Sequence, residues 1–318
     1  MSIAQRYREL FHRTEGAPDQ TGQPFGARIR SWWEGAKPEA EPDMILASAT
    51  VPEAAGPGDP DVLQLAEEWA EDRIALMEQL WGADFISPGD LNYVLDLVKP
   101  IGINPSMHVL NLGAQLGGAT RGVAERWGAW VVGLESSAEL AAKAQKRSYA
   151  RGLGGKAQVK HYDPENATLR SNAFNCAYAR EAFFTVEGKE RLFKAVAAAL
   201  KPSGQFMFTD YVISDPEAEG ARAWIAHEPV AQHIWTQDKT VTCLEKSGFS
   251  IWFNDDLTDQ HQGQILQGWS KLVSSLAPGS LPRNAVGPLV DEVALWARRI
   301  AAIQCGALKL FRFYCVKA

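Results

Sequence analysis

The sequence predicts an α/β fold with a doubly wound, mostly parallel, seven-stranded sheet and a helical cap. Over residues 106–257, short apolar runs typical of buried strands alternate with helical patterns. In addition, the apolar run 109–112 leads into a tight turn at Gly113 and then into a helical pattern. This is the unit that opens such sheets. Short connections between the segments favour right-handed crossovers and a largely parallel sheet.

The remaining elements follow in order. Further strands are predicted at 130–134, 156–161, 174–179, 205–212, 249–253 and 308–316. A helix is expected from Asp61 to Trp81, ended by Gly82, and Asp90 is expected to cap the next helix. Residues 201–204 are predicted as a turn. Later helices are expected at 138–152, 187–200, 235–247 and 258–306.

Changes in composition predict the domain organisation. Residues 1–60, rich in Pro, Gly and Ala, are expected to form an extended N-terminal arm. The other predicted parts are a helical segment at 61–105, the α/β core at 106–257, a helical cap at 258–306 and a closing strand of the core sheet at 307–318.

Composition narrows the class of protein. The net charge of −6 argues against a nucleic-acid partner. The charged N-terminus and the lack of a long apolar run predict a cytoplasmic protein with no transmembrane segment. The four widely spaced cysteines are expected to be buried, reduced thiols. No metal site is expected, because the six-residue spacing of His227 and His233 across Pro229 fits no helical ligand pair.

Two features predict a ligand that contains adenosine. The turn at Gly113 lets a ligand approach backbone N–H groups, and the second strand ends in Glu135, which can accept hydrogen bonds from ribose hydroxyls. They lie 22 residues apart, the separation that one helix and two turns require. Their combination favours a binding site over a purely structural turn.

Several segments resemble class I S-adenosylmethionine-dependent methyltransferases, most closely the phosphoethanolamine and sarcosine/dimethylglycine type. The resemblance covers roughly residues 75–318 and includes the turn and Glu135. Residues 80–89 resemble the segment that covers the cofactor in this family, and residues 179–183 resemble the motif after the fourth strand. Residues 200–204 followed by residues 208–211 also resemble this family, and so does the closing strand.

The resemblance implies S-adenosylmethionine as cofactor and assigns roles to individual positions. Ile86 and Ser87 would contact the cofactor, and Gly113 would approach its methionine part, with Gln115 beside the methionine carboxylate. The other implied contacts are Glu135 and the adjacent Ser136 at the ribose, Asp163 at the adenine amino group and Arg180 along the cofactor.

Three positions depart from the family pattern. Asn111 stands where the first strand usually ends in an acidic residue, so the cofactor ammonium loses a charged partner. Gln115 stands at a glycine position, where its side chain either obstructs the methionine carboxylate or donates to it. Thr185 replaces the catalytic His of phosphoethanolamine enzymes, which argues against that substrate.

The sequence therefore favours a methyltransferase that acts on a small-molecule or lipid-like acceptor. Methyl transfer from a sulfonium depends mainly on alignment and desolvation, so the missing His does not exclude catalysis. Tyr211 and Glu181 are the candidate catalytic residues. The alternative is a catalytically silent methyltransferase-like subunit that binds a partner protein, and homo-oligomerisation also stays open.

Overall fold

The computed structural model describes residues 69–275 and 286–318. One compact unit comprises 71–273 and 283–318, and the account below concerns this unit. The predicted N-terminal arm, the helix start at Asp61 and the middle of the predicted cap lie outside the described residues. The proposed boundaries between core and cap stay predictions.

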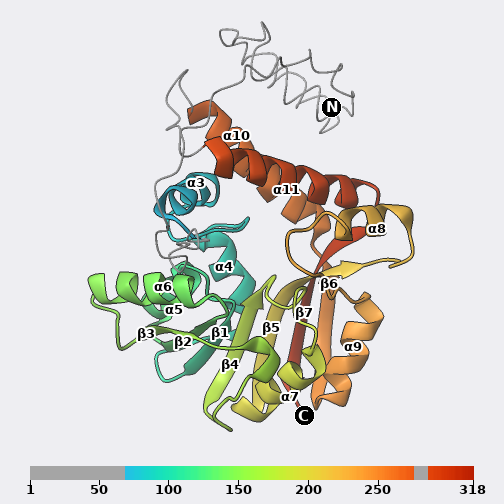
Figure 1. Cartoon of the computed structure of the whole chain (residues 1–318). Coiled ribbons are helices and arrows are strands. Elements are labelled where there is room, and N and C mark those ends of the chain that lie inside the picture. The colour runs from blue at the N-terminus through green and yellow to red at the C-terminus, as the bar shows by residue number, and fades with distance from the viewer. Residues whose placement is uncertain (1–68, 276–285) are drawn as a thin grey trace, which may run out of the picture. The chain divides into compact units, whose positions relative to one another are not determined.

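The described residues form one seven-stranded sheet in the order β3-β2-β1-β4-β5-β7-β6 (Figure 1). The first five strands pair in parallel, whereas β7 lies antiparallel between β5 and β6. This arrangement confirms the predicted doubly wound, mostly parallel sheet. The strands are β1 His108–Leu112, β2 Trp130–Glu135, β3 Ala157–His161, β4 Phe174–Arg180, β5 Leu200–Ile213, β6 Phe249–Asp256 and β7 Leu308–Lys317.

Strand alternation assigns the helices to the two faces of the sheet. Leu110 and Leu112 on β1 belong to a buried cluster that includes side chains of α7 and α9. Asn111, between them, points to the opposite face and contacts Thr120 of α5. Helices α4 and α5 contact each other, and α6 contacts β3. The face of a residue on β1 thus decides whether it joins the apolar core or the region next to α5.

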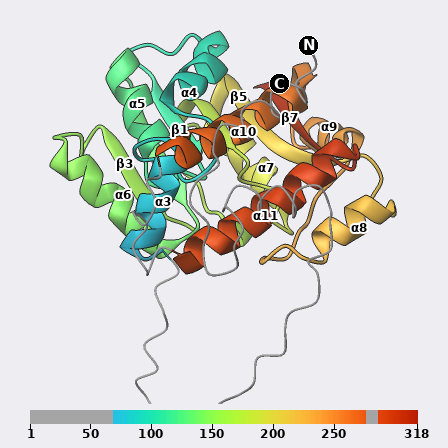
Figure 2. The ribbon, with the colours of Figure 1, turned by 90° about the horizontal axis from the view of Figure 1, so that it is seen from above.

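The helices largely follow the predicted positions. Asp90 caps α4 by accepting a hydrogen bond from the backbone N–H of Tyr93. Helices α10 and α11 run side by side over the carboxyl ends of the central strands (Figures 1 and 2). The main helices are α3 Glu71–Trp81, α4 Leu91–Val98, α5 Gly118–Trp127, α6 Ala138–Ala150, α7 Lys189–Ala199, α8 Glu219–Ile225, α9 Gln237–Lys246, α10 Thr258–Ser275 and α11 Val286–Gln304.

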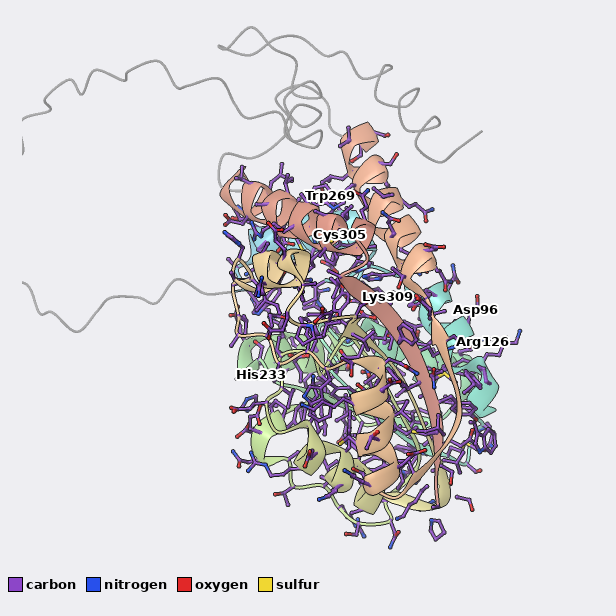
Figure 3. All side chains as sticks on the ribbon, turned by 90° about the vertical axis from the view of Figure 1, so that its right-hand side faces the viewer. Asp96, Arg126, His233, Trp269, Cys305 and Lys309 are labelled. Carbon is purple, nitrogen blue, oxygen red and sulfur yellow. The ribbon has the colours of Figure 1, made fainter. Side chains whose placement is uncertain are left out.

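Three details differ from the sequence predictions. Trp69 and Ala70 are not helical, so α3 begins at Glu71 and the helix expected from Asp61 to Trp81 is not continuous. Residues 201–204 belong to the first part of β5 rather than to a separate turn, and the chain direction is adjusted by a left-handed Ser203 and a register shift against β4. Cys305 is exposed at the end of α11, where the chain turns into β7, so it is not the buried thiol expected (Figure 3). The other three cysteines are buried and unpaired, as expected.

Candidate cofactor site

The turn after β1 is held against the end of β2. The backbone N–H groups of Gly113 and Ala114 both donate to the carbonyl of Leu134, at 2.9 and 3.0 Å. Gly113 has a φ of 71°, and a Cβ there would lie 2.7 Å from the Cβ of Ala182. Glycine is therefore required both by the backbone conformation and by the close approach of the segment after β4.

Glu135 reaches back from the end of β2 to this turn. One carboxylate oxygen accepts the backbone N–H of Gln115 at 2.7 Å. The other accepts the N–H of Ser137 at 3.0 Å and the hydroxyl of Ser136 at 3.3 Å. Burial raises the pKa of Glu135 above its ordinary value, although these donors favour the charged form. The predicted pair of features, the glycine turn and the acidic strand end, is thus one hydrogen-bonded unit.

Gln115 connects the turn to the segment of residues 82–90, which we call the covering segment. Its side-chain amide lies 3.0 Å from the hydroxyl of Ser87 through Nε2 and 3.3 Å through Oε1. Gln115 has a φ of 51°, in the left-handed region that favours glycine. The side chain thus bridges to the covering segment, an orientation that is neither of the two considered from the sequence.

Asp84 fastens the covering segment to α5 and α6. Its carboxylate lies 2.9 Å from Arg121, 2.8 Å from Arg147 and 2.5 Å from Arg151. Burial alone would raise the pKa of Asp84, but hydrogen bonds and charges from these arginines outweigh it and hold the pKa below its ordinary value. Arg147 of α6 and Arg151, which follows the helix, thus bind the covering segment.

Asn111 is buried at the floor of the site. Its Nδ2 donates to the hydroxyl of Thr120 at 2.9 Å. That bond leaves the amide oxygen as an uncharged acceptor.

These elements enclose a narrow pocket. The space that a water molecule can enter is about 10 Å³, room for about one water. The half-buried Ile86 precedes Ser87 in the covering segment. Three of the predicted site residues line this pocket, and its lining consists of Asp84, Phe85, Asn111, Gly113, Ala114, Gln115, Gly118, Ala119 and Arg180.

Arg180 and Glu181 lie where β4 ends. The Arg180 guanidinium donates to the carbonyls of Pro88 and Gly89 and lies 5.3 Å from the ring centroid of Tyr93. Arg180 therefore lines the pocket and also supports the covering segment.

Glu181 is buried behind it. Its Oε1 accepts the Thr209 hydroxyl at 2.7 Å, and its Oε2 has no hydrogen-bond partner within the described part of the chain. Burial raises the pKa of Glu181, so its neutral form is favoured over a wider pH range.

Asp163 is not brought into the pocket. Its exposed carboxylate caps the short helix that follows, accepting from Glu165 N at 2.8 Å and from Asn166 Nδ2 at 2.6 Å. The role of Asp163 at the adenine stays a prediction. Its position is explained by these capping hydrogen bonds without a ligand.

Tyr211 lies farther along the carboxyl edge, on β5. Its hydroxyl is 2.8 Å from Nε2 of His261 on α10, and its ring packs edge-on against Phe184 at 5.1 Å. Burial lowers the pKa of His261 to about 3 and raises that of Tyr211. Both groups are therefore uncharged near neutral pH.

The sequence did not reveal Asp84, His261 or the Arg299–Glu228 ion pair as parts of this region. Only Asp84 had a signal, because it lies within the segment that carries the resemblance and faces the basic positions of α6.

In the described ranges 69–275 and 286–318, no cluster of three or more His, Cys, Asp or Glu side chains could hold a metal ion. No helix within those same ranges is long and apolar enough to cross a membrane.

Sequence comparisons match this chain to methyltransferases. Residues 90–252 match a methyltransferase domain family. The chain is 27% identical to phosphoethanolamine N-methyltransferase 1 of Arabidopsis thaliana over 197 residues, which cover 60% of this chain and 38% of that enzyme. It is 25% identical to a sterol 24-C-methyltransferase of Aspergillus fumigatus over 219 residues, or 67% of this chain and 57% of that enzyme.

Solved structures share the fold. Phosphoethanolamine N-methyltransferase 2 of Haemonchus contortus, solved with phosphomonomethylethanolamine and S-adenosylhomocysteine, matches with a TM-score of 0.69 and 21% identity. The match covers 79% of this chain and 59% of that one. The fold is thus the Rossmann-like fold of class I methyltransferases.

The family match extends over half of the sequence, and this chain belongs to the methyltransferase domain family. It spans well under two thirds of the Arabidopsis relative.

Proposed function

We propose that this chain is an S-adenosylmethionine-dependent methyltransferase that acts on a small-molecule or lipid-like acceptor. The observation that carries the proposal is the hydrogen-bonded unit of the glycine turn and Glu135, placed at the carboxyl ends of β1 and β2 beneath the covering segment. Ligands of open α/β sheets bind at this edge.

The residues present fit such a cofactor. The Glu135 carboxylate has about four acceptor positions, of which three are used, so a ribose hydroxyl can still donate to it. The amide oxygen of Asn111 offers an acceptor to the cofactor ammonium. Gly113 has no side chain to obstruct the methionine part.

Cofactor entry requires a local change. Because the pocket has room for about one water, the Gln115–Ser87 contact must open before the methionine part can bind. The freed Gln115 amide can then donate to the methionine carboxylate. We therefore propose that Gln115 binds the cofactor only after its side chain has released Ser87.

The chemistry suits an acceptor that needs no strong base. The cofactor supplies an electrophilic methyl group, and the protein aligns the acceptor and excludes water. Tyr211 and Glu181 stay the candidate catalytic residues, and burial raises the pKa of both, which favours their neutral forms. In the His261 tautomer whose Nε2–H donates to the Tyr211 hydroxyl, neutral Tyr211 can in turn donate a hydrogen bond to an oxygen of the methyl acceptor and orient it.

Calorimetry with S-adenosylmethionine and S-adenosylhomocysteine tests cofactor binding, and transfer of a labelled methyl group to a panel of small and lipid-like acceptors tests activity. Binding with transfer supports the proposal. Binding without transfer to any acceptor favours the silent subunit. Failure to bind either compound overturns the cofactor assignment.

A further inference from the structure

Arg299 on α11 is neutralised by a carboxylate of the chain itself. Its Nε and Nη2 donate to the two oxygens of Glu228 at 3.0 and 2.8 Å. The indole N–H of Trp224 donates to the same carboxylate at 2.6 Å. The Glu228 side chain is 0% exposed and that of Arg299 is 12% exposed, so the pair is formed away from solvent.

Three aromatic rings surround this guanidinium. Its central carbon lies 5.0 Å from the ring centroid of Trp296, 5.6 Å from that of Phe184 and 5.8 Å from that of Tyr211. The Arg299 guanidinium is thus held by aromatic rings as well as by the Glu228 carboxylate. Beside it, Tyr211 and His261 contribute a neutral hydrogen-bonded pair.

The pair lies at the same edge of the sheet as the proposed cofactor site. Ala182 touches the turn at Gly113, and Phe184 is only two residues farther along the chain. Tyr211 is on β5, two strands from β1, a lateral separation of about 10 Å. Helix α11, which carries Arg299, crosses above this edge (Figure 2). Under the proposed function, we take the aromatic cluster as one wall of the acceptor region.

A forked arginine is the side chain best suited to bind phosphate or carboxylate. Here Glu228 already occupies the fork. An anionic acceptor would have to displace a fully buried carboxylate and leave it without its cation, which is strongly unfavourable. An uncharged acceptor can contact the rings and the Tyr211–His261 pair without displacing Glu228.

We propose that Glu228 is a specificity-determining residue, which fills the anion-binding face of Arg299 and makes the acceptor region select an uncharged acceptor over one bearing phosphate or carboxylate. This inference rests on the proposed function, because it treats the region beside Phe184 and Tyr211 as the acceptor site.

Titration with inorganic phosphate tests the inference without any cofactor, so it is independent of whether S-adenosylmethionine binds. The variant Glu228→Gln retains the shape of the side chain but removes its charge, and it should bind phosphate at least tenfold more tightly than the wild type. Adding Arg299→Met should abolish that gain. Asp255→Asn is the matched control, since Asp255 pairs with Arg312, which also lies over a ring, that of Phe253 at 5.0 Å, but on a more exposed surface.

Equal phosphate affinity of the folded Glu228→Gln protein and the wild type would overturn the inference. An equal gain in the Asp255 variant would do the same, because release of any arginine would then suffice. If the Glu228 variant does not fold, phosphate titration of the wild type tests the inference. The wild type should not bind phosphate at concentrations up to the millimolar range. Tighter binding by the wild type that is lost in Arg299→Met would contradict the inference.

Discussion

The backbone N–H of Gln115 donates to the carboxylate of Glu135 at 2.7 Å, which joins the turn after β1 to the end of β2. Glu135 thus has a structural task in the free protein as well as the proposed one at the ribose. A variant at this position affects both, so its effects on binding and on folding have to be measured separately.

Glu135→Ala should weaken binding of S-adenosylhomocysteine by about 1.5–3 kcal/mol, the range for hydrogen bonds to a charged group. Calorimetry gives the dissociation constant, and thermal unfolding gives the loss of stability. Glu165→Ala is the matched control, because Glu165 also accepts two backbone N–H groups, but those of Glu187 and Gly188 before α7 rather than one in the turn after β1. A dissociation constant equal to that of the wild type would remove the ribose assignment.

The double variant Asn111→Asp with Gln115→Gly restores the family pattern at the turn. It returns a negative charge to the cofactor ammonium, removes the contact with Ser87 and places glycine at the left-handed position with φ 51°. We expect about tenfold tighter binding, equivalent to about 1.4 kcal/mol. If only the double variant binds, the silent-subunit alternative gains support. If neither protein binds, the cofactor assignment fails.

Asp84→Asn should destabilise the protein by about 3–5 kcal/mol, because it leaves the buried Arg121 without its charged partner. Denaturant unfolding measures the change. Glu217→Gln, which breaks an exposed pair with Arg222, should change the free energy of unfolding by about 0.5 kcal/mol or less.

The depressed pKa of Asp84 also fixes the sign of its pH dependence. Its stabilisation is present above the unfolded pKa of about 4 and is lost as the pH falls through the lower folded value. Wild type and Asp84→Asn should therefore become more similar in acid. A constant difference down to pH 2 would contradict this account.

His261 should make the stability of the fold decline in mild acid. The unfolded chain binds a proton on this side chain below about pH 6.5, whereas the folded chain does so only near pH 3. The free energy of unfolding should therefore fall by up to about 1.4 kcal/mol per pH unit in that interval. His261→Gln should reduce this slope. Equal slopes in the wild type and the variant would refute the assignment.

The fold and the centre of the site could be predicted because their signals are local in the sequence. Apolar periodicity marks the strands, and Gly113 and Glu135 are separated by a single helix. The other contacts join segments that no local pattern relates: Tyr211 meets His261 across 50 residues, and Arg299 meets Glu228 across 71. A lone histidine or arginine on a helix gives no sign of its partner.

Asp163 and Ser87 show a different limit. The resemblance assigned both to the cofactor, but in this structure Asp163 caps a short helix and Ser87 holds Gln115. Short polar side chains can serve backbone or ligand equally well, so residue type alone does not distinguish the two uses.

Strand β7 comes last in the chain but lies inside the sheet, between β5 and β6. A polypeptide that ended at residue 307 would leave the long β5 with an unpaired edge, and β6 would have no neighbour at all. Such an edge is a template for pairing with other molecules. Assembly of this half of the sheet must therefore wait for the final ten-residue strand, and truncations there should be prone to aggregation rather than merely less stable.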